Sequence, residues 1–283
     1  MVRRFAILVL LAGAAWAQPR RIVSMAPSIT EMLYALGLGD RVVGVTTFCH
    51  YPPEAARKPK VGNYLQPDLE TILSLRPDLV IAEKSMLRQA ITLPRLKLNL
   101  LEVDDATIAG IYESIRAIGR AAGVASQADA LSKSMESALG AVRQRTSPLP
   151  RVRVLFVVGR TPGRIEDLIA AGGNSYLDEL IAIAGGDNVF HDAVAPYSKV
   201  GLEEVLARNP DVIIDMGEMA QTVGITENRK REVVSLWNRY PSLKAVAAKR
   251  VFAVAADIFV VPGPRVTQAA GQIAAMLHPE AAR

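Results

Sequence analysis

Short, nearly continuous apolar runs alternate with segments of helical spacing in the first hundred residues. The apolar runs have the pattern of parallel strands that are buried on both faces, and they cover residues 21–25, 42–46, 78–82 and 98–103. Between them, residues 28–39 and 68–76 carry apolar side chains at three- and four-residue steps, as helices do. Strands that alternate with helices predict right-handed crossovers and a mainly parallel sheet.

The pattern changes in the middle of the chain and then returns. Residues 105–146 show only helical spacing, and Gly123 is expected to divide them into two helices, the second of which ends at SPLP, residues 147–150. Alternation resumes with further strands predicted at residues 151–159, 211–215 and 250–255, and with helices at 174–185, 202–209, 231–240 and 264–277. The predicted fold class is therefore α/β, with two lobes and a helical segment between them.

One helix-to-strand unit occurs twice. Residues 67–81 align with residues 200–214 so that Glu70 falls on Glu203, at an offset of 203 − 70 = 133. A second pair, residues 28–42 and 175–189, aligns at 175 − 28 = 147 in the same chain order. These matches favour pseudo-repeated lobes, although independent reuse of Ser caps and Pro-Asp turns is the alternative.

The first seventeen residues are predicted to be a cleaved export signal. Arg3 and Arg4 precede a short apolar run, and residues 15–17 fit the small-x-small cleavage rule, so the mature chain is expected to begin at Gln18. An uncleaved N-terminal membrane anchor is the alternative. Because no Cys stands directly after the expected cleavage site, lipid attachment there is not expected.

Composition argues against several classes of partner and chemistry. Half of the 283 residues are hydrophobic and 22% are charged, which is typical of a globular chain. The net charge of +5 is scattered rather than gathered in a basic stripe, so nucleic acid is not an expected partner. The single Cys49 excludes an internal disulfide.

Motifs for catalysis are missing from the sequence. Cys49 and His50 are adjacent, so on an extended stretch their side chains would point apart, and His191 and His278 have no metal-ligand spacing. Neither a nucleophile elbow nor a glycine-rich phosphate-binding motif is present. We therefore expect no enzyme, no catalytic residues, no metal site and no cofactor.

Residues that follow the predicted strands are the candidates for ligand binding. In open α/β sheets ligands lie beyond the carboxyl ends of the strands, and two such lobes that face each other form a cleft. The predicted ligand-binding residues are Pro27, Ser28, Phe48, Tyr51, Tyr64, Glu83, Arg160, Tyr197, Met216, Asp257 and Phe259. Five of them are Phe or Tyr, which indicates a planar or bulky apolar ligand; the alternative is that these aromatics close the cores of the lobes.

The sequence resembles a known family of binding proteins. The segments RIVSMAPSITEMLYALG, TTFCHYPPEA, PDLETILSLRPDLVIA, GGNSYLDELIAIAGGDNVF and VPGPR carry the resemblance. They are similar to the periplasmic binding proteins for cobalamin, ferric siderophores and haem, which feed inner-membrane ABC importers, and the cobalamin-binding branch looks closest. The resemblance implies a monomer in the periplasm that transports a corrinoid or an iron chelate.

The family fold has two α/β lobes that one long helix joins. Carried over to this chain, it implies an N-terminal lobe at residues 18–125, a linking helix within 126–150 and a C-terminal lobe at 151–283. Two other functions compete with this interpretation: an exported metal-handling or chelatase-like enzyme, and a receptor ectodomain. The enzyme would need clustered Cys or His residues, and the receptor a later spanning segment.

The resemblance assigns roles to single residues. Phe48 lies where the cobalamin binder places Tyr, Tyr64 and Tyr197 lie where it places Trp, and Asp257 matches an Asp after a late strand. The aromatic expected after residues 78–82 is replaced by Glu83, followed by Lys84. Part of the flat apolar wall is then expected to be charged, which keeps a ferric siderophore, haem or a modified corrinoid open as ligands.

The repeated glutamates are implied to dock the permease. In the family, one Glu on each lobe enters an arginine pocket of the paired permease subunits, and Glu70 and Glu203 match these positions. Asp68 and Gly201 are expected as helix N-caps, which places each Glu in a first helical turn. The alternative is that each carboxylate only complements the helix dipole, at ~0.3–1 kcal/mol.

Overall fold

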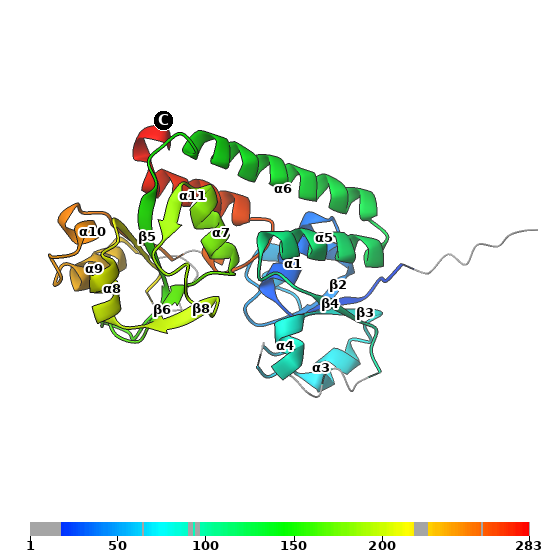
Figure 1. Ribbon diagram of the computed structural model, residues 1–283. Helices are drawn as coiled ribbons and strands as arrows, with labels where there is room; N and C mark the ends of the chain where they lie inside the picture. The colour runs from blue at the N-terminus through cyan, green and yellow to red at the C-terminus, as the bar shows by residue number, and fades with distance from the viewer. Residues whose placement is uncertain are drawn as a thin grey trace, which may run out of the picture.

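The computed structural model describes residues 18–63, 65–89, 93, 97–217, 226–255 and 257–282. Two α/β lobes lie side by side, and one long helix runs along both of them (Figure 1). The lobes are named here by their sheets: strands β1–β4 build the N-terminal lobe and strands β5–β10 build the C-terminal lobe.

The sheet of the N-terminal lobe is entirely parallel, in the order β2-β1-β3-β4. Its strands are β1 (Ile22–Ser24), β2 (Val42–Val45), β3 (Leu79–Glu83) and β4 (Leu100–Val103). Its helices are α1 (Pro27–Ala35), α2 (Pro53–Ala56), α3 (Leu69–Ser74), α4 (Lys84–Gln89) and α5 (Ile108–Ala122), with a 3₁₀ turn at Gly39–Arg41. All four strands and the two helices predicted between them are confirmed.

The C-terminal sheet mixes parallel and antiparallel strands, in the order β10-β9-β5-β6-β8, with β7 paired to β5. Its strands are β5 (Val152–Gly159), β6 (Leu168–Ala171), β7 (Gly186–Asn188), β8 (Tyr197–Val200), β9 (Val212–Asp215) and β10 (Val251–Ala253). Its helices are α7 (Tyr176–Ile183), α8 (Leu202–Arg208), α9 (Glu227–Trp237), α10 (Lys244–Ala247) and α11 (Val266–Leu277), with 3₁₀ turns at Asp257–Phe259 and Pro279–Ala282.

Three strands of this sheet were not predicted. Strand β6 runs antiparallel to both β5 and β8, and β8 begins at Tyr197, which was expected in a loop. Strand β8 has the sequence YSKV at the edge of the sheet, and only Val200 of it is buried. Short edge strands with polar side chains lack the continuous apolar run that identifies a buried strand.

The connecting helix α6 (Ala125–Thr146) begins one residue before its predicted start. Gly123 ends α5 in the left-handed conformation, at φ 74°, and this is the conformation that glycine adopts at lowest cost. Among the described residues no helix is both long and apolar enough to cross a membrane, α6 included. The limits that the sequence predicts for the lobes and the linker stay predictions.

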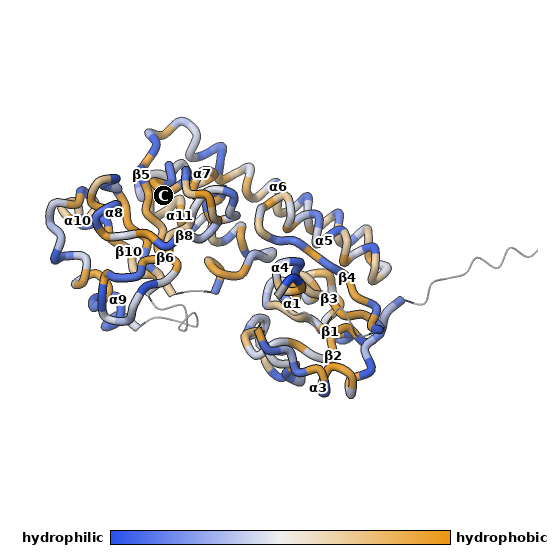
Figure 2. The backbone as a smooth tube through the Cα atoms, turned by 60° about the horizontal axis from the view of Figure 1, so that its bottom comes forward, coloured by the Kyte–Doolittle hydropathy of each residue, from blue (hydrophilic) through white to orange (hydrophobic). Residues whose placement is uncertain are grey.

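One buried apolar cluster runs through both lobes. It joins Leu33 of α1, Met135 of α6 and Leu180 of α7, and two smaller clusters lie within the separate lobes. Hydrophobic stretches occupy the interior strands, and hydrophilic and hydrophobic residues alternate along α6 (Figure 2). Helix α6 packs on α5 in the N-terminal lobe and on α7 and α11 in the C-terminal lobe, so it belongs to the core of both.

Candidate functional site

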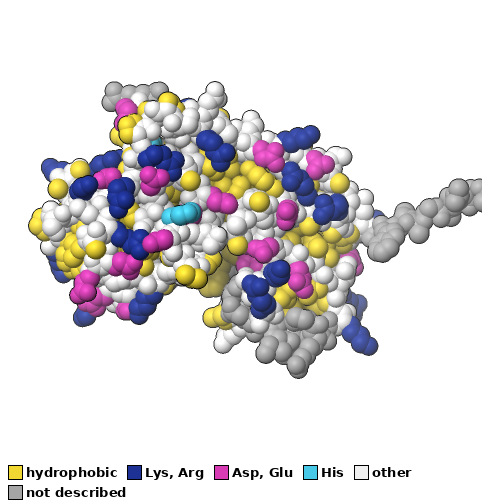
Figure 3. Space-filling view, in the orientation of Figure 1, with side chains coloured by type: hydrophobic (Ala, Val, Ile, Leu, Met, Phe, Trp, Pro, Cys, Tyr) yellow, Lys and Arg dark blue, Asp and Glu magenta, His cyan; other side chains and the backbone are white. Residues whose placement is uncertain are grey.

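A pocket of about 540 Å³ lies between the two lobes. The surface is hollowed where the lobes meet (Figure 3). The N-terminal lobe contributes Glu83, Lys84, Ser85, Arg88, Val103, Asp104, Asp105 and Ala106, and the C-terminal lobe contributes Tyr176, Pro196, Tyr197, Val260 and Pro262. A pocket with walls from two lobes is a preferred type of small-molecule site.

Sheet topology explains why two carboxyl groups meet in this pocket. Strands β3 and β4 are parallel neighbours, and their last residues, Glu83 and Val103, pair in register. The carboxyl ends of both strands therefore reach the same edge of the sheet. Asp105 follows two residues after Val103 and lines the pocket beside Glu83.

Glu83 and Asp105 are held in a largely enclosed environment. The hydroxyl of Ser28 donates a hydrogen bond of 3.1 Å to Oε1 of Glu83, and the hydroxyl of Ser85 lies 3.4 Å from Oε2. Asp105 is only 8% exposed, and its buried Oδ2 has no hydrogen-bond partner among the described residues.

Burial shifts the protonation of both groups. It raises the pKa of Glu83 to about 8, with a further contribution from the nearby charge of Asp105. Burial likewise raises the pKa of Asp105 to about 6. At pH 7 the two carboxyl groups together therefore hold one proton and one negative charge. The full charge expected at position 83 is therefore replaced by a single negative charge that belongs to the pair.

Two tyrosines form the opposite wall of the pocket. The ring of Tyr197 is 44% exposed, and burial around its hydroxyl raises the pKa of that group to about 12. Tyr176 is 2% exposed, and its hydroxyl donates a 2.7 Å hydrogen bond to the carbonyl of Phe259. Its backbone N–H donates to the carbonyl of Ala106 at 2.7 Å, so the lobes are bonded to each other beside the pocket.

A charged cluster joins the lobes through Arg265, at the N-terminus of α11. Its guanidinium pairs with Glu31 of α1, at 2.9 Å from Nε to Oε2, and with Asp257, at 3.0 Å from Nη1 to Oδ1. The same guanidinium carbon lies 3.9 Å from the centre of the Tyr51 ring. Tyr51, predicted to touch ligand, thus contacts Arg265 across the lobes, and Asp257, also predicted to touch ligand, pairs with Arg265 within the C-terminal lobe.

Three predicted ligand residues lie in the core instead of lining the pocket. The Arg160 side chain is 1% exposed and pairs with Asp215 at 3.0 Å. Met216 is 3% exposed, and Phe259 is 1% exposed and packs on Phe156. The side chain of a residue directly after a strand can point either into the core of its own lobe or toward the cleft. The position of the residue in the sequence does not decide between these two directions.

The other predicted ligand residues take varied positions. Ser28 is buried and reaches the pocket only through Glu83, whereas Pro27 is the first residue of α1. Phe48 is 61% exposed and is not among the residues that line the pocket. Tyr64 lies outside the described residues. The structure thus brings together Glu83 and Tyr197, and it adds Asp105 and Tyr176, which the sequence analysis missed.

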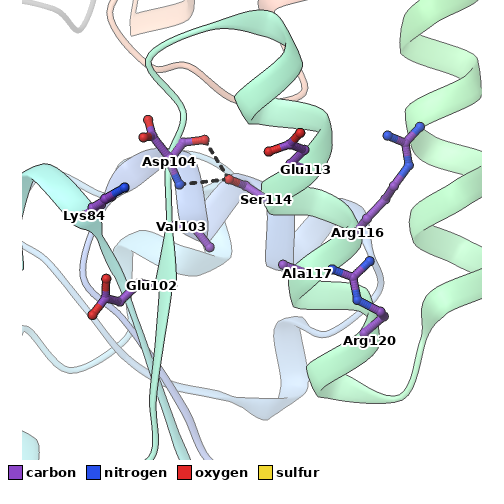
Figure 4. Close-up of a pocket in the computed structure, with 9 residues that line it drawn as sticks. All are labelled: Lys84, Glu102, Val103, Asp104, Glu113, Ser114, Arg116, Ala117 and Arg120. Atoms are coloured by element: carbon purple, nitrogen blue, oxygen red, sulfur yellow. Dashed lines mark hydrogen bonds between the residues drawn. The ribbon is translucent and has the colours of Figure 1, made fainter.

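A second cavity of about 470 Å³ adjoins the first on the outer side of the N-terminal lobe and shares Lys84, Val103 and Asp104 with it. Figure 4 shows that it lies between β4 and α5, where the hydroxyl of Ser114 donates a 2.9 Å bond to the carbonyl of Asp104. Its Arg116 is already paired with Glu136 at 3.1 Å. In the part of the chain that is described, no three His, Cys, Asp or Glu side chains gather as a metal site.

Glu70 and Glu203 do not line this pocket, and their helices, α3 and α8, belong to different lobes (Figure 1). Each is the second residue of its helix, α3 or α8, and each is exposed. Asp68 is the N-cap predicted for α3 and accepts from the N–H of Thr71, and Gly201 is the N-cap of α8. Neither glutamate forms an ion pair with a residue that the structure describes.

Fold and pocket together define a two-lobed α/β protein of the binding-protein type, in which a helix connects the lobes and a pocket lies between them. The chain belongs to the periplasmic binding protein family, whose model matches residues 22–258. Membership in this family, predicted from the resemblance, is confirmed.

Two curated relatives cover most of the chain. An uncharacterised ABC transporter substrate-binding lipoprotein of Bacillus subtilis (strain 168) is 32% identical, over 93% of this chain and 81% of the relative. A vitamin B12-binding protein of Pectobacterium carotovorum subsp. carotovorum (strain PC1) is 30% identical, over 95% of this chain and 92% of the relative.

Two solved structures share the whole fold. The periplasmic vitamin B12-binding protein of Vibrio cholerae has a TM-score of 0.78 and 26% identity, over 93% of this chain and 98% of that chain. A periplasmic haem-binding protein from Roseiflexus sp. RS-1, in its apo form, has a TM-score of 0.76 and 27% identity, over 93% and 99% of the two chains.

Proposed function

We propose that this protein captures a corrinoid of the cobalamin type between its lobes and delivers it to an ABC permease. The observation that carries the proposal is the pocket whose walls come from both lobes, with the half-exposed ring of Tyr197 on one side. Relatives that bind vitamin B12 share its family and fold. We assign it no catalytic role, since the family and its solved members are binding proteins.

A ferric siderophore or haem is the alternative ligand. Lys84 and Arg88 lie at the exposed rim of the pocket, where they could meet the carboxylates of haem, and a haem-binding protein shares the fold. The interior of the pocket carries Glu83 and Asp105 instead, and this favours a ligand that is not anionic where it meets them.

Delivery requires a partner in the membrane. The Bacillus relative is an ABC transporter substrate-binding protein, and we propose an inner-membrane permease as the partner here. Glu70 and Glu203 are suited to dock it because they are exposed on separate lobes at matching helical positions. We propose that the protein acts as a monomer.

We propose that the protein works in the periplasm after export. The signal expected at residues 1–17 lies outside the described residues. One relative is a lipoprotein, so the absence of a lipid on this chain stays a prediction.

Titration calorimetry tests the ligand directly. Purified protein is expected to bind cyanocobalamin with a dissociation constant below about 1 μM, which corresponds to ~8 kcal/mol. A ferric hydroxamate and haemin are titrated in parallel. If only one of those two binds, the corrinoid is the wrong ligand; if none of the three binds, the assignment as a binding protein for this ligand class fails.

Removing the exposed aromatic wall is expected to weaken binding. Tyr197→Ala should raise the dissociation constant for the corrinoid roughly tenfold, because an aromatic anchor supplies contact area at little entropic cost. The matched control Tyr197→Phe keeps the ring and should stay within about threefold of the wild type. Calorimetry gives both constants, and loss of the cooperative melt in Tyr197→Ala would show that the residue supports the fold instead.

A further inference from the structure

We propose that the Glu83–Asp105 pair makes the pocket selective for ligands whose edge carries hydrogen-bond donors, above all primary amides, and against ligands whose edge carries carboxylates. The inference rests on the proposed function and specifies the chemical class of ligand for the same pocket. It follows from an unsatisfied acceptor, from the arrangement of charge around that acceptor, and from the chemistry of the possible ligands.

The unsatisfied acceptor is Oδ2 of Asp105. It is buried and accepts no hydrogen bond from a backbone N–H or hydroxyl among the described residues, although Asp105 lines the pocket; the protonated carboxyl of Glu83 is the donor beside it. A buried acceptor without a partner destabilises the site, so a ligand that brings a donor gains more here than at an exposed carboxylate. A carboxylate also has lone pairs for several donors, so a proton shared with Glu83 leaves capacity for a ligand.

The groups around Glu83 and Asp105 do not neutralise the negative charge of this pair inside the pocket. Ser28 and Ser85 offer hydroxyls to Glu83, and Tyr176 and Tyr197 face the pair from the other lobe as neutral phenols. The remaining charged groups that line the pocket are Asp104, Lys84 and Arg88, and all three side chains are exposed. Water and salt screen exposed charges, so Lys84 and Arg88 neutralise the enclosed pair only weakly.

This arrangement distinguishes the candidate ligands by the chemical groups at the edge of their rings. A corrin ring carries primary amide side chains, whose N–H groups can satisfy Asp105. Haem carries carboxylates, which would meet a like charge inside the pocket, and a carboxylate beside another buried carboxylate is disfavoured. The carboxyl pair of Glu83 and Asp105 therefore fits a corrinoid better than haem.

The sharpest test uses two corrinoids with the same ring and metal. Cobinamide carries amides at the edge of the ring, and cobyrinic acid carries carboxylic acids there. At pH 7 the wild type is expected to bind cobinamide at least about tenfold more tightly than cobyrinic acid in titration calorimetry. No substitution is needed for this comparison, so it does not depend on the folding of a variant.

The pH dependence of this selectivity is expected to have two steps. As pH rises through about 6, Asp105 loses its proton and becomes the charged acceptor, so the preference for amides should increase. As pH rises through about 8, Glu83 ionises as well, and the carboxylate ligand should be disfavoured further. Titrations at pH 5, 7 and 9 measure both steps.

Three variants assign the steps to residues. Asp105→Asn should leave a single step, that of Glu83, at a lower pH than the upper step of the wild type because the charge of Asp105 no longer raises the pKa of Glu83, and it should reduce the selectivity at pH 7. Glu83→Gln imitates the protonated acid, so at pH 7 it should resemble the wild type within about threefold while lacking the upper step. The matched control Glu102→Gln, an exposed acid of β4 outside this pocket, should keep both steps. Since the ligand titrates identically with every variant, differences between variants report on the protein.

The outcomes separate this inference from the proposed function. If both corrinoids bind the wild type equally and Asp105→Asn changes nothing, the inference is overturned although a corrinoid-binding protein remains. If haemin binds more tightly than either corrinoid, both the selectivity and the corrinoid assignment are wrong. If none of the probes binds, the proposed function fails, and the inference fails with it.

Discussion

Reversing the charge at both Glu70 and Glu203 is expected to abolish ligand uptake while leaving ligand affinity and melting temperature nearly unchanged. Each glutamate is exposed in the first turn of its helix, on a different lobe and away from the pocket. Truncating one partner of a buried charge pair across an interface costs ~2–5 kcal/mol, and in the proposed docking reversal would add repulsion against the arginine pockets that the family resemblance implies for the permease. The single reversals Glu70→Arg and Glu203→Arg should give intermediate uptake because one lobe still docks.

Uptake is measured in vesicles that carry the cognate importer, beside calorimetry and thermal melting of the same variants. The matched control is Glu54→Arg with Glu227→Arg, which reverses two other first-turn carboxylates. Both double variants lose helix-dipole partners worth ~0.3–1 kcal/mol each, and the control also loses the exposed ion pair of Glu227 with Lys230, so it should lose at least as much stability. Uptake at the wild-type rate by the Glu70→Arg/Glu203→Arg protein would leave these glutamates as helix-start residues only.

Substitution of Asp215 is expected to destabilise the fold strongly. Its side chain is wholly buried and accepts from Nε of Arg160 at 3.0 Å, from the indole N–H of Trp237 at 2.6 Å and from the N–H of Gly217 at 2.6 Å. Asp215→Asn removes the charge opposite Arg160 and leaves a buried guanidinium uncompensated. Breaking a buried pair in this way typically costs ~3–5 kcal/mol in the free energy of unfolding, which urea denaturation measures.

Two further variants show whether the buried charge is the cause. Arg160→Met with Asp215→Asn removes both charges and should recover part of the loss. Asp187→Asn breaks the exposed pair with Arg151, whose side chains are about half exposed, and should cost under ~1 kcal/mol. A loss below ~1 kcal/mol for Asp215→Asn would contradict the prediction and show that water or neighbouring groups compensate Arg160.

Hydrophobic pattern was sufficient to predict most of the fold. Strands such as β3, with four successive buried residues, and amphipathic helices such as α5 are identified by period alone. Strand β8 was missed because it lies at the sheet edge and buries only one residue, whereas β6 was missed although its four residues, LIAA, are apolar. Their antiparallel pairing depends on contacts between distant segments, which local pattern does not encode.

The site was predictable only where a residue follows a strand directly. Glu83 ends β3, and the rule that ligands bind beyond the carboxyl ends of strands placed it correctly near the pocket. Asp105 also lies just beyond the carboxyl end of a strand, β4. It was not predicted as a site residue because it is the first residue of a segment that was predicted to be helical. Tyr176 looked like an apolar helix residue, and only the packing of one lobe on the other reveals its place. The direction in which Arg160 and Phe259 turn is likewise set by tertiary packing.

The buried cluster that passes from Leu33 through Met135 to Leu180 has a thermodynamic consequence. Apolar side chains of helix α6 pack in this cluster against helices of both lobes. Neither lobe therefore has a complete apolar interior without that helix. Unfolding one lobe would expose the face of α6 that it covers, and this couples the two lobes into a single cooperative unit. Although the lobes resemble two separate domains in outline, heat should melt them together, and a ligand held between them should stabilise both at once.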